Sequence, residues 1–414
     1  MSRSDWKKLK LDTIGAFSKG AGVSKDELKT EGISAVRYGE IYTQHNTKVK
    51  TIGSLISKQS ARSSKRIKRG DILFAGSGET IDDIGKSVAY LFDDECYAGG
   101  DIVIFSPIKD DSLFLSYLLN SQTLRRELRR LGQGQSVVHL YARDLRELKV
   151  SLPSKQEQQR IVEVLETWDQ YLEMLDAKIE LKKEAKKGLL KNLLAGNRRL
   201  PGFSTQWSTV KIKSICTVKR GGSPRPIDSY ITDEADGLNW LRIGDINSGD
   251  RYIYKTSEKI RKEGLKKTTL VHAGDFILSN SMSFGRPYIM KIDACIHDGW
   301  LALMGISAQV NKSYLYYLLS SEIMQAKFKS ISAGSGVQNL KKETVSEVYI
   351  SLPSRGEQDA ITNILTATDD EIEMLKEKRV LAASQKQYLI DNLITGKVST
   401  PENLRVSKKE ASHA

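Results

Sequence analysis

The feature that most constrains the fold of this chain is a repeat at an offset of 200 residues. The tetrapeptide Ser-Leu-Pro-Ser at 151–154 recurs at 351–354, and Glu-Met-Leu at 173–175 recurs at 373–375. Weaker matches in nearly the same register extend over the 150 residues that precede each of these segments. Such a repeat indicates two copies of one structural unit. We therefore expect the order A–B–A′–B′, in which the A segments have diverged and the B segments have stayed alike.

The B segments are predicted to be long helices. Ser154 and Glu157 have the spacing of a capping box, and glycines at 196 and 396 are typical helix stops. Apolar residues between them fall at 161, 165, 168, 172, 175 and 179. Steps of four and three residues are those of the a and d positions of a coiled coil.

Polar residues, Lys182 and Lys186, interrupt this apolar seam before it resumes at 189. A helix of about 40 residues is about 60 Å long and cannot bury its seam alone. We therefore expect the two helices to pair with each other in antiparallel orientation. The alternative is that each helix packs on its own globular neighbour.

Each A segment is predicted to be a mixed domain, with short strands and one helix. The helices are expected over 113–131 and 313–331. The strands are expected over 72–74, 87–92, 102–105, 276–278, 288–290 and 301–304. The fold class is thus α+β: two mixed α/β domains separated by a pair of long antiparallel coiled-coil helices. The predicted boundaries are 1–150 for the first domain, 151–198 for the first helix, 199–350 for the second domain, 351–397 for the second helix and 398–414 for a polar tail.

The charge of the chain indicates a polyanionic partner. Lys and Arg number 64 against 51 Asp and Glu, which gives a formal charge of +13. A nucleic acid or an anionic membrane surface would suit that excess. No apolar run approaches the roughly 18 residues that span a bilayer, and the first ten residues do not resemble a secretory signal. The three cysteines are far apart and suggest neither a disulfide framework nor a metal site. We expect a cytoplasmic chain that binds no membrane.

Three local patterns are typical of enzymes, and each is incomplete. Residues 74–78 fit the Phe-x-Gly-x-Gly of adenosylmethionine-binding folds, but the chain has no Pro-Pro pair for the motif that should follow. Gly85-Lys86-Ser87 resembles the end of a P-loop, whose first glycine is replaced by Thr80. Acidic runs at 82–83 and 93–95 could suggest a metal-dependent nuclease, but no lysine has the required spacing. We predict no catalytic residues, no cofactor and no metal in this chain.

The B segments carry a family resemblance. Leu-Pro-Ser followed by Glu-Gln and an isoleucine runs from 152 to 161 and again from 352 to 361, and each helix closes on Leu-Leu-Ala-Gly or Leu-Ile-Thr-Gly. Gly-Gly-Ser-Pro at 221–224 resembles the start of a target recognition domain. Together these motifs resemble the specificity (S) subunit of type I restriction-modification enzymes.

The resemblance implies a non-catalytic subunit that binds double-stranded DNA. Each recognition domain would read one half of a bipartite, asymmetric target. The helices would set the distance between the halves and dock two methylase (M) subunits, which carry S-adenosylmethionine and methylate adenine. Restriction motor-nuclease (R) subunits would join for cleavage. The alternative is a coiled-coil interaction protein that binds nucleic acid without a methylase partner.

Candidate DNA-binding residues follow from side-chain chemistry. Phosphate contacts are expected from two basic stretches, Lys65, Arg66, Lys68 and Arg69, and Lys219, Arg220 and Arg225. Base edges are read by Arg on guanine and by Asn or Gln on adenine, which selects Gln133, Gln135, Asn280, Arg286, Gln338 and Asn339. The alternatives are ordinary solvated charge and helix-capping loops. Arg37 and Arg242 occupy equivalent repeat positions, which favours a shared structural or phosphate-binding role.

The methylase interface is predicted from repetition along the helices. Charged residues that recur in the two copies point to one face, with the alternative of a plain solvated surface. The predicted set is Glu173, Lys178, Lys182, Glu373 and Lys378.

Overall fold

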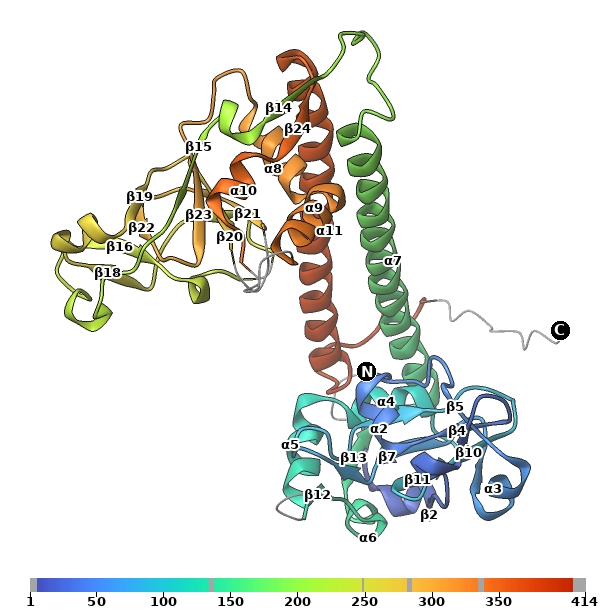
Figure 1. Ribbon diagram of the computed structural model, residues 1–414. Helices are drawn as coiled ribbons and strands as arrows, with labels where there is room; N and C mark the ends of the chain where they lie inside the picture. Colours follow the sequence, from blue (N-terminus) through green and yellow to red (C-terminus); the bar gives the residue numbers. More distant parts are fainter. Residues whose placement is uncertain (1–5, 134–137, 248, 281–284, 334–338, 405–414) are drawn as a thin grey trace. The chain divides into compact units, whose positions relative to one another are not determined.

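The computed structural model describes residues 6–133, 138–247, 249–280, 285–333 and 339–404 (Figure 1). The chain divides into two compact units. The first holds the residues up to Asp176 together with those from Glu377 onward, and the second holds Ala177–Lys376. Two long helices, α7 (Lys155–Leu194) and α11 (Arg355–Leu393), pass from one unit into the other. Each unit therefore contains one globular domain and one half of each long helix.

The domain of the first unit is built on two sheets. The four-stranded sheet has the order β2 (Gly15–Lys19), β11 (Ile102–Pro107), β7 (Ile72–Ala75) and β9 (Ser87–Ala89). The five-stranded sheet has the order β3 (Leu28–Lys29), β5 (Ser54–Ile56), β4 (Ile33–Val36), β10 (Cys96–Ala98) and β6 (Lys65–Ile67). Successive side chains of a strand point to opposite faces, so Ile72 and Phe74 pack in one core cluster and Leu73 in another. The four-stranded sheet is buried on both faces.

The domain of the second unit repeats this plan. One sheet has the order β15 (Thr217–Arg220), β23 (Trp300–Met304), β20 (Phe276–Ser279), β21 (Pro287–Met290) and β17 (Tyr252–Ile253). The other has the order β18 (Glu258–Ile260), β16 (Leu238–Leu241), β22 (Ala294–Ile296) and β19 (Thr269–Val271). Phe276 and Leu278 again face one core cluster and Ile277 the other. The mixed α+β class expected for both A segments is confirmed.

Short elements complete the two domains. Strand β1 (Lys7–Lys10) pairs with β13 (Lys149–Leu152), β14 (Ser208–Lys211) pairs with β24 (Tyr349–Leu352), and β8 (Ser77–Gly78) pairs with β12 (Val138–His139). The short helices are α1 (Leu11–Ile14), α2 (Tyr38–Thr43), α3 (Lys58–Ser63), α6 (Ala142–Arg146) and α10 (Lys342–Ser346). Single 3-10 turns lie at η2 (Lys25–Glu27), η3 (Ile212–Ser214), η4 (Ile227–Ser229), η5 (Ile243–Asp245) and η6 (Lys262–Lys267).

The expectation of one helix per domain was wrong, because each predicted helix is two. The first unit has α4 (Ser112–Leu119) and α5 (Gln122–Leu131), and the second has α8 (Lys312–Ser320) and α9 (Glu322–Ala333). The Asn120 amide donates to the Ser116 carbonyl at 2.8 Å, and the Ser321 hydroxyl donates to the Leu318 carbonyl at 2.7 Å. Polar side chains that bind nearby carbonyls compete with the helix, and the chain breaks at both places.

The long helices pair in antiparallel orientation within each unit. In the first unit Arg379 Nε lies 3.0 Å from Asp176 Oδ1, and Lys386 forms an ion pair with Asp169. From the first pair to the second, the residue number rises along α11 and falls along α7. The two helices therefore run in opposite directions, and the expected antiparallel pairing is confirmed.

The lysines that interrupt the predicted seam belong to this contact. In the second unit Lys182 Nζ lies 2.7 Å from Glu371 Oε2, and Lys186 forms an ion pair with Asp369. These interruptions of the apolar pattern are therefore interhelical ion pairs.

The ends of the helices also enter the domain cores. Ile161 and Leu165 of α7 share the first core with Leu393, the last residue of α11, and with Ile394, which follows it. In the second unit the relation is reversed, because the end of α7 packs with the start of α11 (Leu193, Leu194, Ile361 and Leu365). Each domain is thus covered by the beginning of its own helix and the end of the other. Packing on the globular neighbour, weighed as an alternative to pairing, occurs together with it.

The capping box expected at Glu157 forms only in part. The backbone N–H of Glu157 donates to Ser154 Oγ at 3.3 Å, but the Glu157 carboxylate accepts from the N–H of Thr400 at 3.0 Å and from Arg160 Nη2 at 2.6 Å. Burial alone would raise the pKa of Glu157, but these hydrogen bonds outweigh it and hold the pKa below the ordinary value of 4.5. The segment that follows α11 is thereby held at the start of α7.

The same glutamate position holds the interdomain segment in the second unit. Glu357 accepts two hydrogen bonds from Arg199, at 2.7 and 2.8 Å, and one from Trp207 Nε1 at 3.1 Å. The segment after each long helix is therefore fixed by the buried glutamate that begins the other.

A tyrosine from each domain completes the contact between its two helices. Tyr117 of α4 donates its hydroxyl to Asp169, and its ring centroid lies 5.6 Å from Lys386 Nζ. Burial and the charge of Asp169 raise the pKa of Tyr117 above 10.0, so the hydroxyl keeps its proton and remains a donor.

The second unit repeats the arrangement residue for residue. Tyr317 donates to Asp369 Oδ2 at 2.7 Å, and its ring lies 5.6 Å from Lys186 Nζ. Burial and Asp369 raise the pKa of Tyr317 to about 12. Each domain is thus joined by one tyrosine to an aspartate of one helix and a lysine of the other.

Replacement of Lys386 by methionine should destabilise the first unit strongly. The Lys386 side chain is only 7% exposed, and its loss leaves Asp169, whose side chain is 19% exposed, with an uncompensated charge. Breaking such a pair costs about 3 kcal/mol, which corresponds to a drop in melting temperature of roughly 6–12 °C for a unit of this size. Differential scanning calorimetry of the full chain measures the shift.

Lys183→Met is the matched control. Lys183 pairs with Glu180 of its own helix, on an exposed face, and surface pairs contribute little. Adding Asp169→Asn to Lys386→Met should restore part of the loss, because the uncompensated charge is removed. Equal small shifts for Lys386→Met and Lys183→Met would show that the ion pair does not hold the helices.

Candidate nucleic-acid interface

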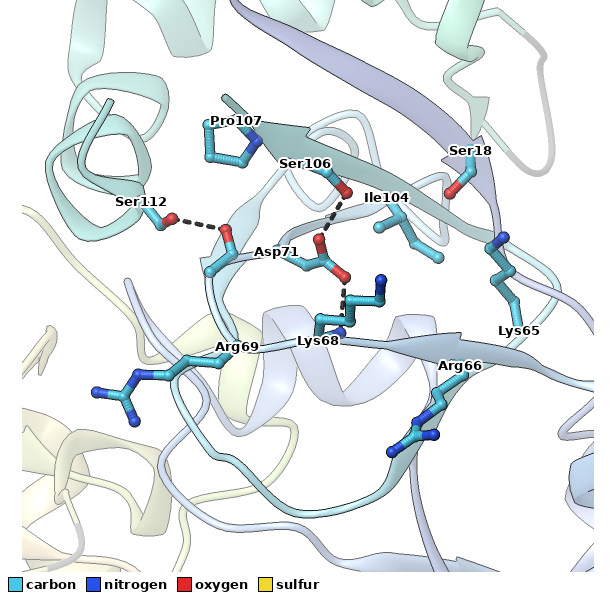
Figure 2. Close-up of a pocket in the computed structure, with 11 residues that line it drawn as sticks. Ser18, Lys65, Arg66, Lys68, Arg69, Asp71, Ile104, Ser106, Pro107 and Ser112 are labelled. Carbon is cyan, nitrogen blue, oxygen red and sulfur yellow. Dashed lines mark hydrogen bonds between the residues drawn. The ribbon is translucent and has the colours of Figure 1, made fainter. Parts of the chain in front are cut away.

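The first basic stretch lines a cavity in the first unit (Figure 2). The four side chains expected on phosphates come together there around a space of about 390 Å³, with Ser18, Ser106 and Ser112 on its other sides. Two of them, Lys65 and Arg66, lie on the edge strand β6. The set is Lys65, Arg66, Lys68 and Arg69, all of them exposed.

A buried aspartate shapes the turn that presents these cations. Asp71 accepts from the backbone N–H of Lys68 at 2.8 Å and from Ser106 Oγ at 2.6 Å, as Figure 2 shows. Arg69 is tied to the rim, because its Nη1 donates to the Leu91 carbonyl at 2.7 Å and lies 2.9 Å from Asp93 Oδ2. A rigid turn with several exposed cations is suited to phosphate binding.

In the second unit three of the predicted residues converge on Asp298. The Asp298 carbonyl accepts from Arg220 Nε at 3.2 Å and from Asn280 Nδ2 at 2.8 Å, and Arg225 Nη2 lies 4.0 Å from Asp298 Oδ2. Asn280 is 2% exposed, so its amide orients the turn. Arg225 is 84% exposed along its side chain and is available to a ligand.

His297 fixes the other side of the same aspartate. Its Nδ1 accepts from the N–H of Gly299 at 2.9 Å, and its Nε2 lies 2.9 Å from Asp298 Oδ1. The Nδ1 contact places the proton of the neutral ring on Nε2, which donates to Asp298. Ser223 Oγ donates to the same oxygen, Asp298 Oδ1, at 2.9 Å. The sequence interpretation missed His297 and Asp298, which carry no local motif.

The other predicted DNA-binding residues do not join these two clusters. Gln133 is exposed and exchanges backbone hydrogen bonds with His139 at 2.9 and 2.8 Å. Lys219 is exposed on β15, and the Arg286 guanidinium lies 5.8 Å from the Tyr288 ring centroid. Asn339 is half-buried at the start of the segment that leads to α10. Gln135 and Gln338 lie outside the described residues.

The residues predicted for partner binding are placed unevenly. Glu173 pairs with Lys50 of the first domain at 2.6 Å, and Glu373 pairs with Lys376 of its own helix at 2.9 Å. Lys182 lies in the contact between the helices. The other two residues, Lys178 and Lys378, are exposed, and Lys378 Nζ lies 5.9 Å from the Tyr171 ring centroid.

Exposed apolar residues on the long helices were missed by the sequence interpretation. In the first unit Met174 is 60% exposed, and Val380 and Leu381 are exposed as well. In the second unit Leu181 is 72% exposed and Met374 is also exposed. The signal that could have identified them is the repetition of apolar residues outside the predicted a and d positions, since methionine recurs at 174 and 374 and leucine at 181 and 381.

Two further searches of the structure concern metals and membranes. In the part of the chain that the structure describes, no three His, Cys, Asp or Glu side chains are grouped as a metal ion would require. Among these same residues, no helix combines the length and the apolar character needed to cross a membrane.

Comparison with known families explains the repeat. The family model for the type I restriction modification DNA specificity domain matches residues 3–184 and again residues 205–382. The chain belongs to this family. It is a type I specificity subunit with two recognition domains, and the resemblance inferred from the helix motifs is confirmed.

The relatives agree with this assignment. The putative type I restriction enzyme MjaX specificity subunit of Methanocaldococcus jannaschii is 25% identical, over 82% of this chain and 81% of that protein. The MjaVIII specificity subunit of the same organism is 23% identical, over 70% of each.

Solved structures share the fold. The specificity subunit from M. genitalium aligns with a TM-score of 0.55 at 16% identity, over 94% of this chain and 96% of that one. A chain from a structure concerned with assembly and conformational transition of the type I restriction-modification system aligns with a TM-score of 0.63 at 18% identity, over 96% and 100%.

Neutralising the cavity cations should weaken DNA binding uniformly. The triple variant Lys65→Gln, Arg66→Gln and Lys68→Gln removes three positive charges, and each phosphate contact contributes about 0.9 to the slope of log affinity against log salt. We expect the slope to fall by up to about 2.7, with similar losses of affinity for every duplex sequence. Fluorescence anisotropy across a salt series measures it.

The control removes three exposed lysines that lie outside the cavity, and it should change the slope by less than one. These are Lys109→Gln, Lys155→Gln and Lys183→Gln. An unchanged slope in the cavity variant would exclude the cavity from the DNA interface.

Proposed function

We propose that each recognition domain of this specificity subunit reads one half of a bipartite, asymmetric DNA target, and that the paired helices dock two methylase subunits. The observation that carries the proposal is the repetition itself. Two domains of one topology differ in the side chains that they expose, whereas the helices repeat their exposed residues. Two recognition domains with different exposed side chains suit an asymmetric DNA target. Two helix surfaces with the same exposed side chains suit two copies of one partner.

The domains supply the asymmetry. The second domain gathers Arg220 and Arg225 around Asp298, and the first gathers its cations beside Asp71 and the edge strand β6. Base contacts specify a sequence and phosphate contacts position the protein on the duplex. Two domains with different exposed polar groups therefore read two different sequences. Because α7 and α11 continue from one unit into the other, their length sets the number of base pairs between the half-sites.

The helices supply two equivalent docking surfaces. The register in which Asp169 meets Lys386 places Met174 at the same level as Leu381. In the second unit the register of Lys186 with Asp369 likewise places Leu181 level with Met374. These side chains are exposed, and exposed apolar groups flanked by charges are typical of protein interfaces, in which Met is enriched.

The chemistry belongs to the partners in this proposal. The methylase subunits bind S-adenosylmethionine and methylate adenine, and motor-nuclease subunits join them for cleavage. The role of this chain is to hold its two half-sites and to place each methylase subunit beside one of them.

Exchange of the first domain tests the reading function. Replacing residues 1–150 with the corresponding domain of another specificity subunit should change one half of the methylated sequence and leave the other half intact. The replacement should keep a tyrosine at 117 and a tryptophan at 6, because these residues contact Asp169 and approach Gly396. Methylation mapping on DNA treated with the reconstituted complex gives the result. A change in both halves would contradict modular reading.

Charge insertion tests the docking function. Met174→Glu with Leu381→Glu should remove one methylase subunit from the complex, because a buried apolar contact would have to accept two carboxylates. Leu181→Glu with Met374→Glu should remove the other. Native mass spectrometry counts the subunits.

Ile108→Glu is the control, since Ile108 is an equally exposed apolar residue of the first domain. If all of the helix variants kept both partners, the apolar pairs would not be the docking surfaces. A chain that bound DNA but retained no methylase would support the alternative of an interaction protein without that partner.

A further inference from the structure

The two domains share one backbone arrangement at the end of their first sheet strand. The N–H of Gly20 donates to the Ile102 carbonyl at 2.8 Å, and the N–H of Gly221 donates to the Trp300 carbonyl at 2.9 Å. A Cβ on Gly20 would lie 1.9 Å from the carbonyl oxygen of Gly99, and one on Gly221 would lie 2.1 Å from that of His297. In both domains only glycine permits this approach.

A second pair of hydrogen bonds extends the equivalence to the neighbouring sheet. The N–H of Gly99 donates to the Val36 carbonyl at 2.9 Å, and the N–H of His297 donates to the Leu241 carbonyl at 3.2 Å. Gly99 and His297 are therefore equivalent positions. The turn that follows, 99–101 in one domain and 297–299 in the other, lies against the glycine loop in both.

The next residues along the chain, Arg37 and Arg242, are also equivalent. The N–H of Arg37 donates to Glu40 Oε2 at 2.8 Å, and that of Arg242 donates to Asp245 Oδ2 at 2.8 Å. The shared position noted in the sequence thus has a shared structural role. Each domain thus contains three equivalent segments: the glycine loop, the turn at 99–101 or 297–299, and the segment that follows Arg37 or Arg242.

Each set of loops borders a hollow. In the first domain it measures about 630 Å³ and is lined by the glycine loop, by the 99–101 turn and by α2 with Arg37. In the second domain it measures about 410 Å³ and is lined by Arg242, Gly244, Asp245, Ser257 and His297. The turn at Gly99 or His297 and the segment that follows Arg37 or Arg242 line both hollows. The glycine loop lines the first hollow, and in the second domain it adjoins His297.

The side chains at these equivalent positions differ. Where the second domain has His297, Asp298 and Gly299, the first has Gly99-Gly100-Asp101. Where the second domain has Arg225, the equivalent position of the first domain is Ser24. Two domains that recognise different DNA sequences need different side chains, and an equivalent backbone holds these side chains at the same positions.

We propose that these equivalent hollows are the base-reading sites of the two domains. This inference rests on the proposed function, because it assigns residues to the half-sites. In the second domain Arg225, on the glycine loop that adjoins the hollow and 4.0 Å from Asp298 Oδ2, donates two hydrogen bonds to a guanine edge in the major groove. In the first domain Glu79 and Asp101, which line the hollow, accept from the exocyclic amino group of cytosine or adenine.

Cations line each hollow and would hold the adjacent phosphates. They are Lys25 and Arg37 in the first domain and Arg242 in the second. The reading site and the phosphate contacts are therefore neighbours in both domains.

Arg225→Lys in the reconstituted complex tests the assignment. Lysine keeps the charge but lacks the planar fork that binds guanine through two hydrogen bonds. Methylation of a duplex library with both half-sites randomised should show that preference for guanine falls about 10- to 100-fold at one position of the second half-site. The first half-site should be unchanged, and Glu79→Gln with Asp101→Asn should alter the first half-site alone.

Arg261→Lys is the matched control, because Arg261 is an exposed arginine of the same domain that lies at the start of η6 instead of on the glycine loop. Melting curves of each variant establish that it is folded. Unaltered base preference in Arg225→Lys, or a uniform loss over all sequences, would overturn the assignment even though a bipartite site was still methylated. If the wild-type complex methylated no bipartite site, the proposed function itself would fail.

Discussion

The architecture depends on an ion pair that joins the two long helices inside each unit. Lys386 meets Asp169 in the first unit, and Lys186 meets Asp369 in the second. A charged pair in a helix contact costs desolvation energy and so adds little stability, but it is sensitive to register, because a shifted helix would leave both charges unpaired. The tyrosine of each domain donates to the same aspartate, so one polar cluster fixes helix to helix and domain to helices.

The buried glutamates at the starts of the long helices fix the connecting segments in the same way. Glu157 binds Thr400 and Glu357 binds Arg199, so each globular domain is closed by the segment that leaves the other repeat's helix. The cores follow the same rule, since Leu393 packs in the first core and Leu193 in the second. The proposed function divides along the same lines. The parts that repeat would offer equivalent surfaces to partners, and the parts that differ would present different side chains to the duplex.

Much of the fold could be predicted because the relevant signals are periodic. The apolar steps from Ile161 to Ile179 identify a helix with one buried side, and the identical register of the second copy supplies its partner. Periodicity failed at Asn120, where a side-chain amide bonds to carbonyls of the preceding turn and of a neighbouring strand and divides the helix. It also failed at Lys186, which is polar in sequence yet takes part in the helix contact, because burial of a charge depends on a partner 183 residues away.

The sequence by itself determined the repeat, the long helices, their pairing and the family, because these follow from spacing along one chain. It also identified the basic stretch at 65–69 as one group, since its members are neighbours. Only the tertiary structure decided which polar residues converge. Arg220, Asn280 and Asp298 are separated by up to 78 residues and meet because strands distant in sequence lie side by side in the folded domain. Composition and spacing carry no record of such pairings, because they arise when backbone hydrogen bonds and core packing bring the strand ends together.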